Sequence, residues 1–137
     1  NTPVLVRSAL GLGQSSMAIT LAAFGGGSML AALLLPRVLG RFSDRSVMLS
    51  AASAMTIGLA VLALSWSGHA SPDYWGVILA GWFVLGVAYA ASITPGGRLL
   101  RRSSAEEDRP ALFAAQFALT HVCWLIAYPL AGQVGAN

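Results

Sequence analysis

The stretch that decides the fold is Pro36-Arg37-Val38-Leu39-Gly40-Arg41-Phe42-Ser43-Asp44-Arg45-Ser46-Val47-Met48, a short charged segment between two long apolar runs. Residues 8–36 before it and residues 46–72 after it contain no charged side chain. Each run is long enough to cross a bilayer, because about 20 apolar residues in a helix span the roughly 30 Å of hydrocarbon. The short connection keeps the two helices adjacent, so the sequence predicts an antiparallel membrane hairpin with charged residues at its tip.

The composition excludes an ordinary soluble domain. Of the 137 residues, 56% are hydrophobic and only 9% are charged, and the mean hydropathy is +0.70. Soluble globular domains carry about 25% charged residues. The net charge of +3 does not indicate nucleic acid as a partner, because the arginines lie at the ends of apolar runs rather than in one patch. The expected partner is the lipid bilayer.

Two further charge-free runs, residues 74–97 and 110–137, complete the pattern. We expect a chain that begins at Asn1 to be cut from a longer parent. The third helix is expected to stop at Pro95-Gly96-Gly97, a strong termination signal, whereas Pro110 suits the first turn of the fourth helix. The sequence therefore predicts an all-α integral membrane protein, with residues 1–137 forming a single partial transmembrane domain of four helices at about 15–35, 46–66, 74–94 and 110–134.

The arginines define the expected topology. Of the eight arginines, all but Arg7 fall in two segments on one side of the predicted helices: Arg37, Arg41, Arg45, Arg98, Arg101, Arg102 and Arg109. Positively charged loops stay on the cytoplasmic side of a membrane. We therefore expect loops 37–45 and 98–109 to be cytoplasmic, in a multi-pass protein of the plasma (bacterial inner) membrane.

The fourth predicted helix separates its side chains by chemistry. At about 100° per residue, seven polar and aromatic side chains between residues 113 and 128 fall within an arc of about 140°: Phe113, Gln116, Phe117, Thr120, His121, Trp124 and Tyr128. Polar side chains gathered on one side of a helix would not be stabilised by contact with lipid, so this face should meet protein or a water-filled cavity. Two interpretations stay open, namely hydrogen bonding between helices and contact with a transported solute. A narrower hypothesis makes His121 a proton relay, although no carboxylate lies in any predicted helix.

The third predicted helix carries a smaller stripe of Trp82, Gly86 and Tyr89, which fits either helix packing or a substrate path. The glycine run at residues 25–27 is expected to let helices approach closely. The single cysteine, Cys123, gives no disulfide framework and no metal-ligand spacing. The sequence holds no paired carboxylates and no Ser-His-Asp set, so we expect no catalytic residue, no metal, no cofactor and no enzyme activity.

The hairpin tip also carries a family resemblance. Gly40, Asp44 and Arg45, placed between two membrane helices, resemble the loop signature G-x-x-x-D-[RK]-x-G-[RK]-[RK] of the major facilitator superfamily of transporters. The match ends at Ser46-Val47-Met48, where the full motif has glycine and basic residues. Because the second half of these proteins carries the degraded copy, the chain resembles helices eight to eleven of the twelve-helix fold, with Asn1-Thr2-Pro3 ending helix seven. Helices two to five of the first half are the alternative placement.

The resemblance implies part of a secondary active transporter that moves a small solute by alternating access, as efflux or uptake. Its partners would be the missing half of the same transporter and an unidentified small molecule. By the same resemblance, Gly40, Asp44 and Arg45 would form a gating motif at the cytoplasmic contact between the halves. The substrate path would include Trp82, Tyr89 and the face of the fourth helix. The alternatives are a small multidrug-type exporter and a non-transporting four-helix scaffold or assembly subunit.

Overall fold

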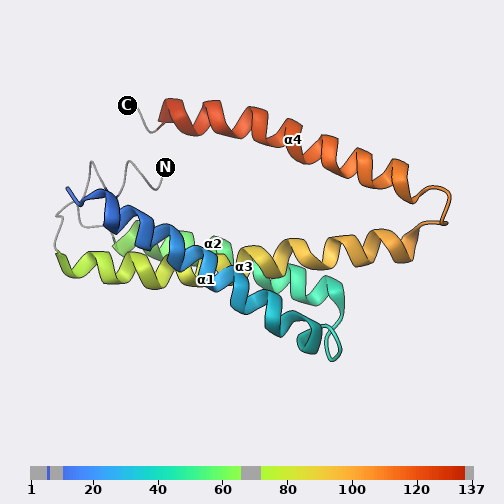
Figure 1. Cartoon of the computed structure of the whole chain (residues 1–137), viewed down its shortest axis with the longest axis horizontal. Helices are drawn as coiled ribbons and strands as arrows, with labels where there is room; N and C mark the ends of the chain where they lie inside the picture. The colour runs from blue at the N-terminus through green and yellow to red at the C-terminus, as the bar shows by residue number, and fades with distance from the viewer. Residues whose placement is uncertain (1–5, 7–10, 66–71, 135–137) are drawn as a thin grey trace. The chain divides into compact units, whose positions relative to one another are not determined.

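The computed structural model of the protein describes residue 6 and residues 11–65 and 72–134, and the expected end of helix seven at residues 1–3 lies outside them. Four helices run through the described part of the chain (Figure 1): α1 (Gln14–Val38), α2 (Asp44–Ser65), α3 (Pro72–Ser103) and α4 (Arg109–Val134). Each helix is long and apolar enough to cross a membrane. The prediction of four spans is therefore confirmed.

The predicted stop of the third helix is wrong. Pro95 lies inside α3, which continues to Ser103. A proline removes one backbone hydrogen bond, but ending the helix at membrane depth would expose several backbone groups to hydrocarbon. The turn before Pro95 is reinforced by side chains, since the hydroxyl of Thr94 donates to the carbonyl oxygen of Ala90 at 2.7 Å. In the same way α1 passes through Pro36, where the sequence had suggested its end.

The proline-glycine segment of α3 instead coincides with a boundary between compact units. One unit contains residues 2–96, and the other contains residues 97–137 with Asn1. The second unit consists of the end of α3, a short turn and α4. Because α3 continues to Ser103, the predicted loop 98–109 is reduced to residues 104–108, and three of its arginines occupy the last turns of a helix.

The turn between α1 and α2 is tight, as the hairpin prediction requires. The backbone N–H groups of Arg41 and Phe42 both donate to the carbonyl oxygen of Val38, at 3.0 and 2.9 Å. At the start of α2, the backbone N–H of Ser46 donates to the hydroxyl oxygen of Ser43 at 3.2 Å. Ser43 therefore caps α2 by satisfying one of the free donors at its first turn.

The closest approach between helices is the crossing of α1 with α3. A Cβ atom added to Gly27 would collide with the backbone carbonyl of Phe83, and one added to Gly86 would collide with the carbonyl of Phe24. The two backbones are therefore in direct contact, an arrangement that only glycine permits on each helix. Ser28 lies at the crossing, where its one hydroxyl hydrogen is shared between the carbonyl oxygen of Gly86 on α3 at 3.2 Å and that of Phe24 on its own helix at 3.1 Å.

Contacts on both sides of this crossing show that α1 and α3 are parallel. Near the start of both helices, the indole N–H of Trp75 donates to the hydroxyl oxygen of Thr20 at 3.2 Å. Thr20 is fully buried, and its own hydroxyl donates to the carbonyl of Ser16. Toward the other end, a cluster of buried apolar side chains joins α1, α3 and the start of α2: Ala31, Leu35, Leu39, Val47 and Ala90.

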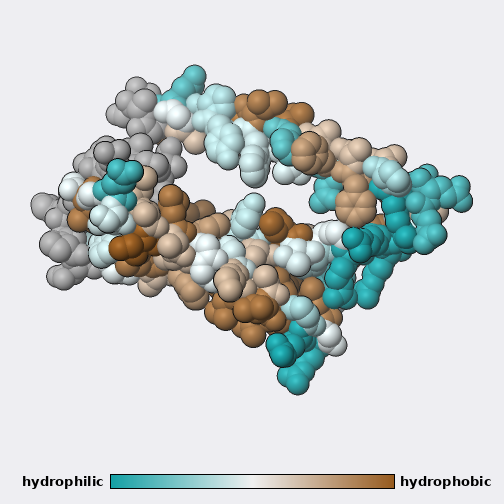
Figure 2. Space-filling view, in the orientation of Figure 1, coloured by the Kyte–Doolittle hydropathy of each residue, from teal (hydrophilic) through white to brown (hydrophobic). Residues whose placement is uncertain are grey.

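Helix α2 packs against α3 along one side and leaves most of its surface uncovered within this unit. The hydroxyl of Tyr74, at the start of α3, donates to the carbonyl oxygen of Leu62 near the end of α2 at 2.9 Å. The exposed side chains of α2 are mostly apolar: Leu49, Ile57, Leu59, Val61 and Leu64. Figure 2 shows hydrophilic residues gathered at the hairpin tip and at the turn before α4, with hydrophobic ones along the helices. This distribution suits helices in contact with lipid.

The glycine crossing yields a stability prediction. In Gly27→Ala the new methyl group would overlap the Phe83 carbonyl, so α1 and α3 must separate, and we expect a loss of about 1–3 kcal/mol. The matched control is Gly25→Ala, where an added Cβ meets no atom within 4 Å. Thermal unfolding of the detergent-solubilised protein should show a lower midpoint for Gly27→Ala alone. Equal midpoints for the two variants would contradict the close crossing.

Candidate functional site

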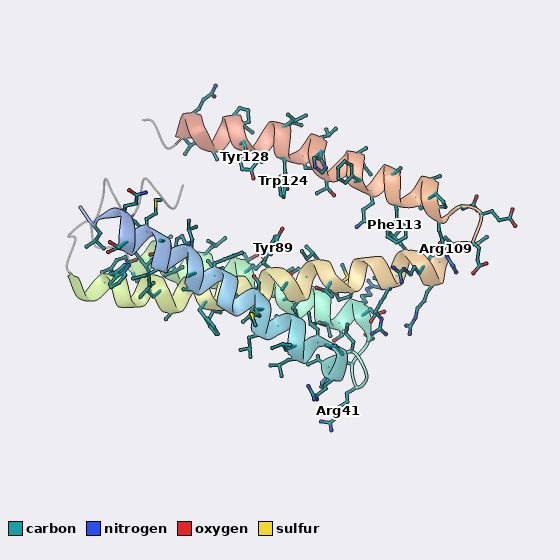
Figure 3. All side chains as sticks on the ribbon, viewed as in Figure 1. Arg41, Tyr89, Arg109, Phe113, Trp124 and Tyr128 are labelled. Carbon is teal, nitrogen blue, oxygen red and sulfur yellow. The ribbon has the colours of Figure 1, made fainter. Side chains whose placement is uncertain are left out.

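The polar and aromatic side chains of α4 form one continuous face, as the sequence predicts. Ring centroids of Phe117 and His121 lie 3.8 Å apart, and those of His121 and Trp124 lie 6.0 Å apart. The series continues with Trp124 and Tyr128 at 5.7 Å. Residues three and four apart in a helix share a side, which explains why these rings follow one another along α4. We call this row of rings the ladder, and the side of α4 that carries it the ladder face. Figure 3 shows Phe113 and Trp124 projecting from the same side of α4.

A shallow, open depression of about 270 Å³, called the α4 groove below, lies along the first part of this face. Its lining combines two aromatic rings with three side chains that can form hydrogen bonds: Phe113, Gln116, Phe117, Thr120 and His121. None of the residues in the apolar window of α4 is buried within the described unit. The chemistry of the two sides nevertheless differs, since the opposite side presents exposed apolar side chains such as Leu119, Leu125 and Ile126.

Two side chains of the groove donate a hydrogen bond to the backbone of α4. Nδ1 of His121 lies 2.8 Å from the carbonyl oxygen of Phe117, so it is the nitrogen that carries the proton and donates. The hydroxyl of Thr120 donates to the carbonyl oxygen of Gln116 at 2.8 Å. The sequence analysis missed both bonds, although threonine in a helix commonly bonds to the carbonyl four residues earlier.

The α3 stripe serves largely in packing. The ring of Tyr89 lies 5.7 Å from the ring of Phe24 on α1, and Gly86 is one of the two glycines at the helix crossing. Trp82 is half-buried. These residues belong to a different compact unit from α4, so a common substrate path with α4 stays a prediction.

The motif residues of the hairpin tip occupy distinct environments. A Cβ at Gly40 would lie 3.4 Å from the carbonyl oxygen of Arg37, which is an ordinary van der Waals contact, and the φ angle of Gly40 is not positive, so the turn itself has room for a side chain here. Asp44 opens α2 and is only 5% exposed, which places its carboxylate at the favourable positive end of the helix dipole. Its neighbour Arg45 is exposed. The acid of the motif thus lies inside the protein while the base lies at its surface.

The described residues contain no group of three or more His, Cys, Asp and Glu side chains that could hold a metal ion. Cys123 is a free, exposed cysteine. It lies three residues after Thr120, at the edge of the polar and aromatic face of α4.

A protein-family model described as Major Facilitator Superfamily matches residues 1–137. The chain belongs to the major facilitator superfamily. It is therefore an all-α, multi-pass membrane protein of a transporter family, and the identification suggested by the hairpin tip is confirmed. A search of curated proteins and a search of solved structures each found no match. The assignment of this major facilitator chain to helices eight to eleven remains a prediction.

The two sides of α4 can be distinguished by labelling. With Cys123→Ala as the background, Thr120→Cys should react with a charged, water-soluble maleimide in membranes, because we expect the ladder face to meet water or protein. Ile126→Cys in the same background, on the apolar side, should react only with a lipid-soluble maleimide. The control is denatured protein, in which both thiols must label fully. Rapid reaction of Ile126→Cys with the charged reagent would contradict this orientation of α4.

Proposed function

We propose that this chain is part of a secondary active transporter that moves a small solute across the membrane by alternating access, with the ladder face of α4 lining the solute path. The observation that carries this proposal is the separation of chemistry on α4. Five rings and two further hydrogen-bonding side chains occupy one side, whereas the other side is apolar over residues 114–130. In a bilayer, polar side chains turn toward the protein interior or a water-filled cavity.

The motif at the hairpin tip supports the conformational part of the proposal. Alternating access requires one half of a transporter to rock against the other around a central site. The hairpin turn is tight, and the buried Asp44 beside the exposed Arg45 gives that turn a fixed charge arrangement. A contact between such a tip and the second half of the transporter would stabilise one end state. We assign this gating role to Gly40, Asp44 and Arg45.

The proposed path is tested by solute-protected labelling in the intact protein. Single cysteines at Gln116, Thr120 and Trp124, in the Cys123→Ala background, should react with a water-soluble maleimide, and a transported solute should slow that reaction. Ile126→Cys on the opposite side is the matched control and should show no protection. Failure of all three positions to label would make this face a helix-packing surface and would favour the scaffold alternative.

The topology gives a separate prediction. Gly13 precedes α1, where an added Cβ meets open space, and Phe42 at the hairpin tip is 60% exposed. Because the arginine-rich side is expected to be cytoplasmic, a membrane-impermeant maleimide added to whole cells should label Gly13→Cys and spare Phe42→Cys. Inverted membrane vesicles should reverse the result. Labelling of Phe42→Cys in whole cells would place the arginines outside.

A further inference from the structure

We propose that the α4 groove selects solutes that donate hydrogen bonds, namely uncharged or cationic molecules with a flat apolar part and at least one O–H or N–H group. This inference rests on the proposed solute path and adds the chemical class of the solute. It follows from the way Thr120 and His121 use their hydrogens. With the imidazole neutral, neither side chain has a hydrogen left to offer to a solute.

The imidazole of His121 is the clearer case. A carbonyl oxygen only accepts, so the 2.8 Å contact with the carbonyl of Phe117 requires the proton on Nδ1. In the neutral ring the other nitrogen, Nε2, then has a lone pair and no hydrogen. Stacking against the ring of Phe117 at 3.8 Å holds the imidazole beside the groove. His121 therefore offers a fixed hydrogen-bond acceptor.

Thr120, the residue before His121, also offers the groove a hydrogen-bond acceptor and no donor. Its single hydroxyl hydrogen is donated to the carbonyl oxygen of Gln116 at 2.8 Å. Its oxygen keeps lone pairs that can accept, and its side chain lines the groove beside His121. Two neighbouring acceptors thus lie together, and the carboxamide of Gln116 supplies the groove with one group of both polarities.

The surroundings of these acceptors define the rest of the solute. Phe117 is 66% exposed and Trp124 is 46% exposed, so both rings offer surface to an apolar or aromatic group. The cation of α4, Arg109 at its first position, is paired with Glu106 at 3.0 Å. No charged side chain follows it up to residue 134, so the groove itself holds no cation for a carboxylate or phosphate. An anion would bring its lone pairs against those of Thr120 and His121. A site built for a donor also discriminates against an analogue that lacks it, because its acceptors are then left unpaired.

Three coumarins with the same ring system separate the effect of a hydrogen-bond donor on binding from the effect of a negative charge. The first, 7-amino-4-methylcoumarin, has two N–H donors, whereas 7-dimethylamino-4-methylcoumarin has none, and 7-amino-4-methylcoumarin-3-acetate adds an anion. The reporter is Phe113→Cys in the Cys123→Ala background of the intact protein in membrane vesicles, labelled with a water-soluble maleimide. We measure the concentration of each coumarin that halves the labelling rate.

The amino compound should protect at a concentration about three- to tenfold lower than the dimethylamino compound, as expected for the loss of one hydrogen bond. The acetate should protect least. Greater hydrophobicity would favour the dimethylamino compound, so membrane partitioning alone predicts the opposite order. In Thr120→Val with His121→Phe the preference should disappear, because both acceptors are replaced by apolar groups. Thr120→Ser keeps the hydroxyl and should retain the preference.

The outcomes separate this inference from the proposed path. Labelling of Phe113→Cys with equal protection by all three coumarins, or with protection by none, would overturn the donor preference and leave the solute path standing. A preference that survives Thr120→Val with His121→Phe would overturn the role of these two acceptors. If cysteines at Gln116, Thr120 and Trp124 all fail to label, the path itself fails, and the inference fails with it.

Discussion

Hydrocarbon offers backbone N–H and C=O groups no partner, so each of them must be satisfied within the protein. This constraint explains why α1, α3 and α4 continue through Pro36, Pro95 and Pro129 instead of ending there. A single lost hydrogen bond costs less than a helix end at membrane depth. It also explains why small polar side chains in these helices bond to the carbonyl four residues earlier, as in Thr20, Thr94 and Thr120. Because Thr120 and His121 donate to the carbonyl four residues earlier in the same way, both are left as hydrogen-bond acceptors on α4.

Because helices in lipid gain nothing from hiding apolar surface from one another, close backbone contact has to hold them together. Gly27 and Gly86 provide it on α1 and α3, and Ser28 shares its hydroxyl hydrogen between the two helices at the crossing. The Trp75–Thr20 bond and the apolar cluster around Leu35 keep the two helices parallel on either side. A solute path cannot run between α1 and α3 at this point, because no space separates their backbones. The remaining faces, including that of α4, are available for it.

The sequence predicted the number of spans, the tight hairpin and the ladder face because each depends on local rules: charge-free length, turn length and helical periodicity. It misjudged the end of α3, since Pro95-Gly96-Gly97 terminates a helix in water but coincides here with a boundary between compact units. The glycine run was correctly linked to packing, yet only the structure singles out Gly27 and pairs it with Gly86. The burial of Asp44 and the tautomer of His121 depend on three-dimensional contacts that spacing alone does not encode.

The length of α3 has a mechanical consequence. Its 32 residues extend about 48 Å at 1.5 Å per residue, well beyond the roughly 30 Å of hydrocarbon. Pro95 lies between the fixed glycine crossing and the terminal arginines, with eight residues following it to Ser103. That segment is about 12 Å long, so a bend of about 10° at the proline would move its tip by about 2 Å. Charged groups outside the membrane could thus change position while the crossing inside it stays undisturbed.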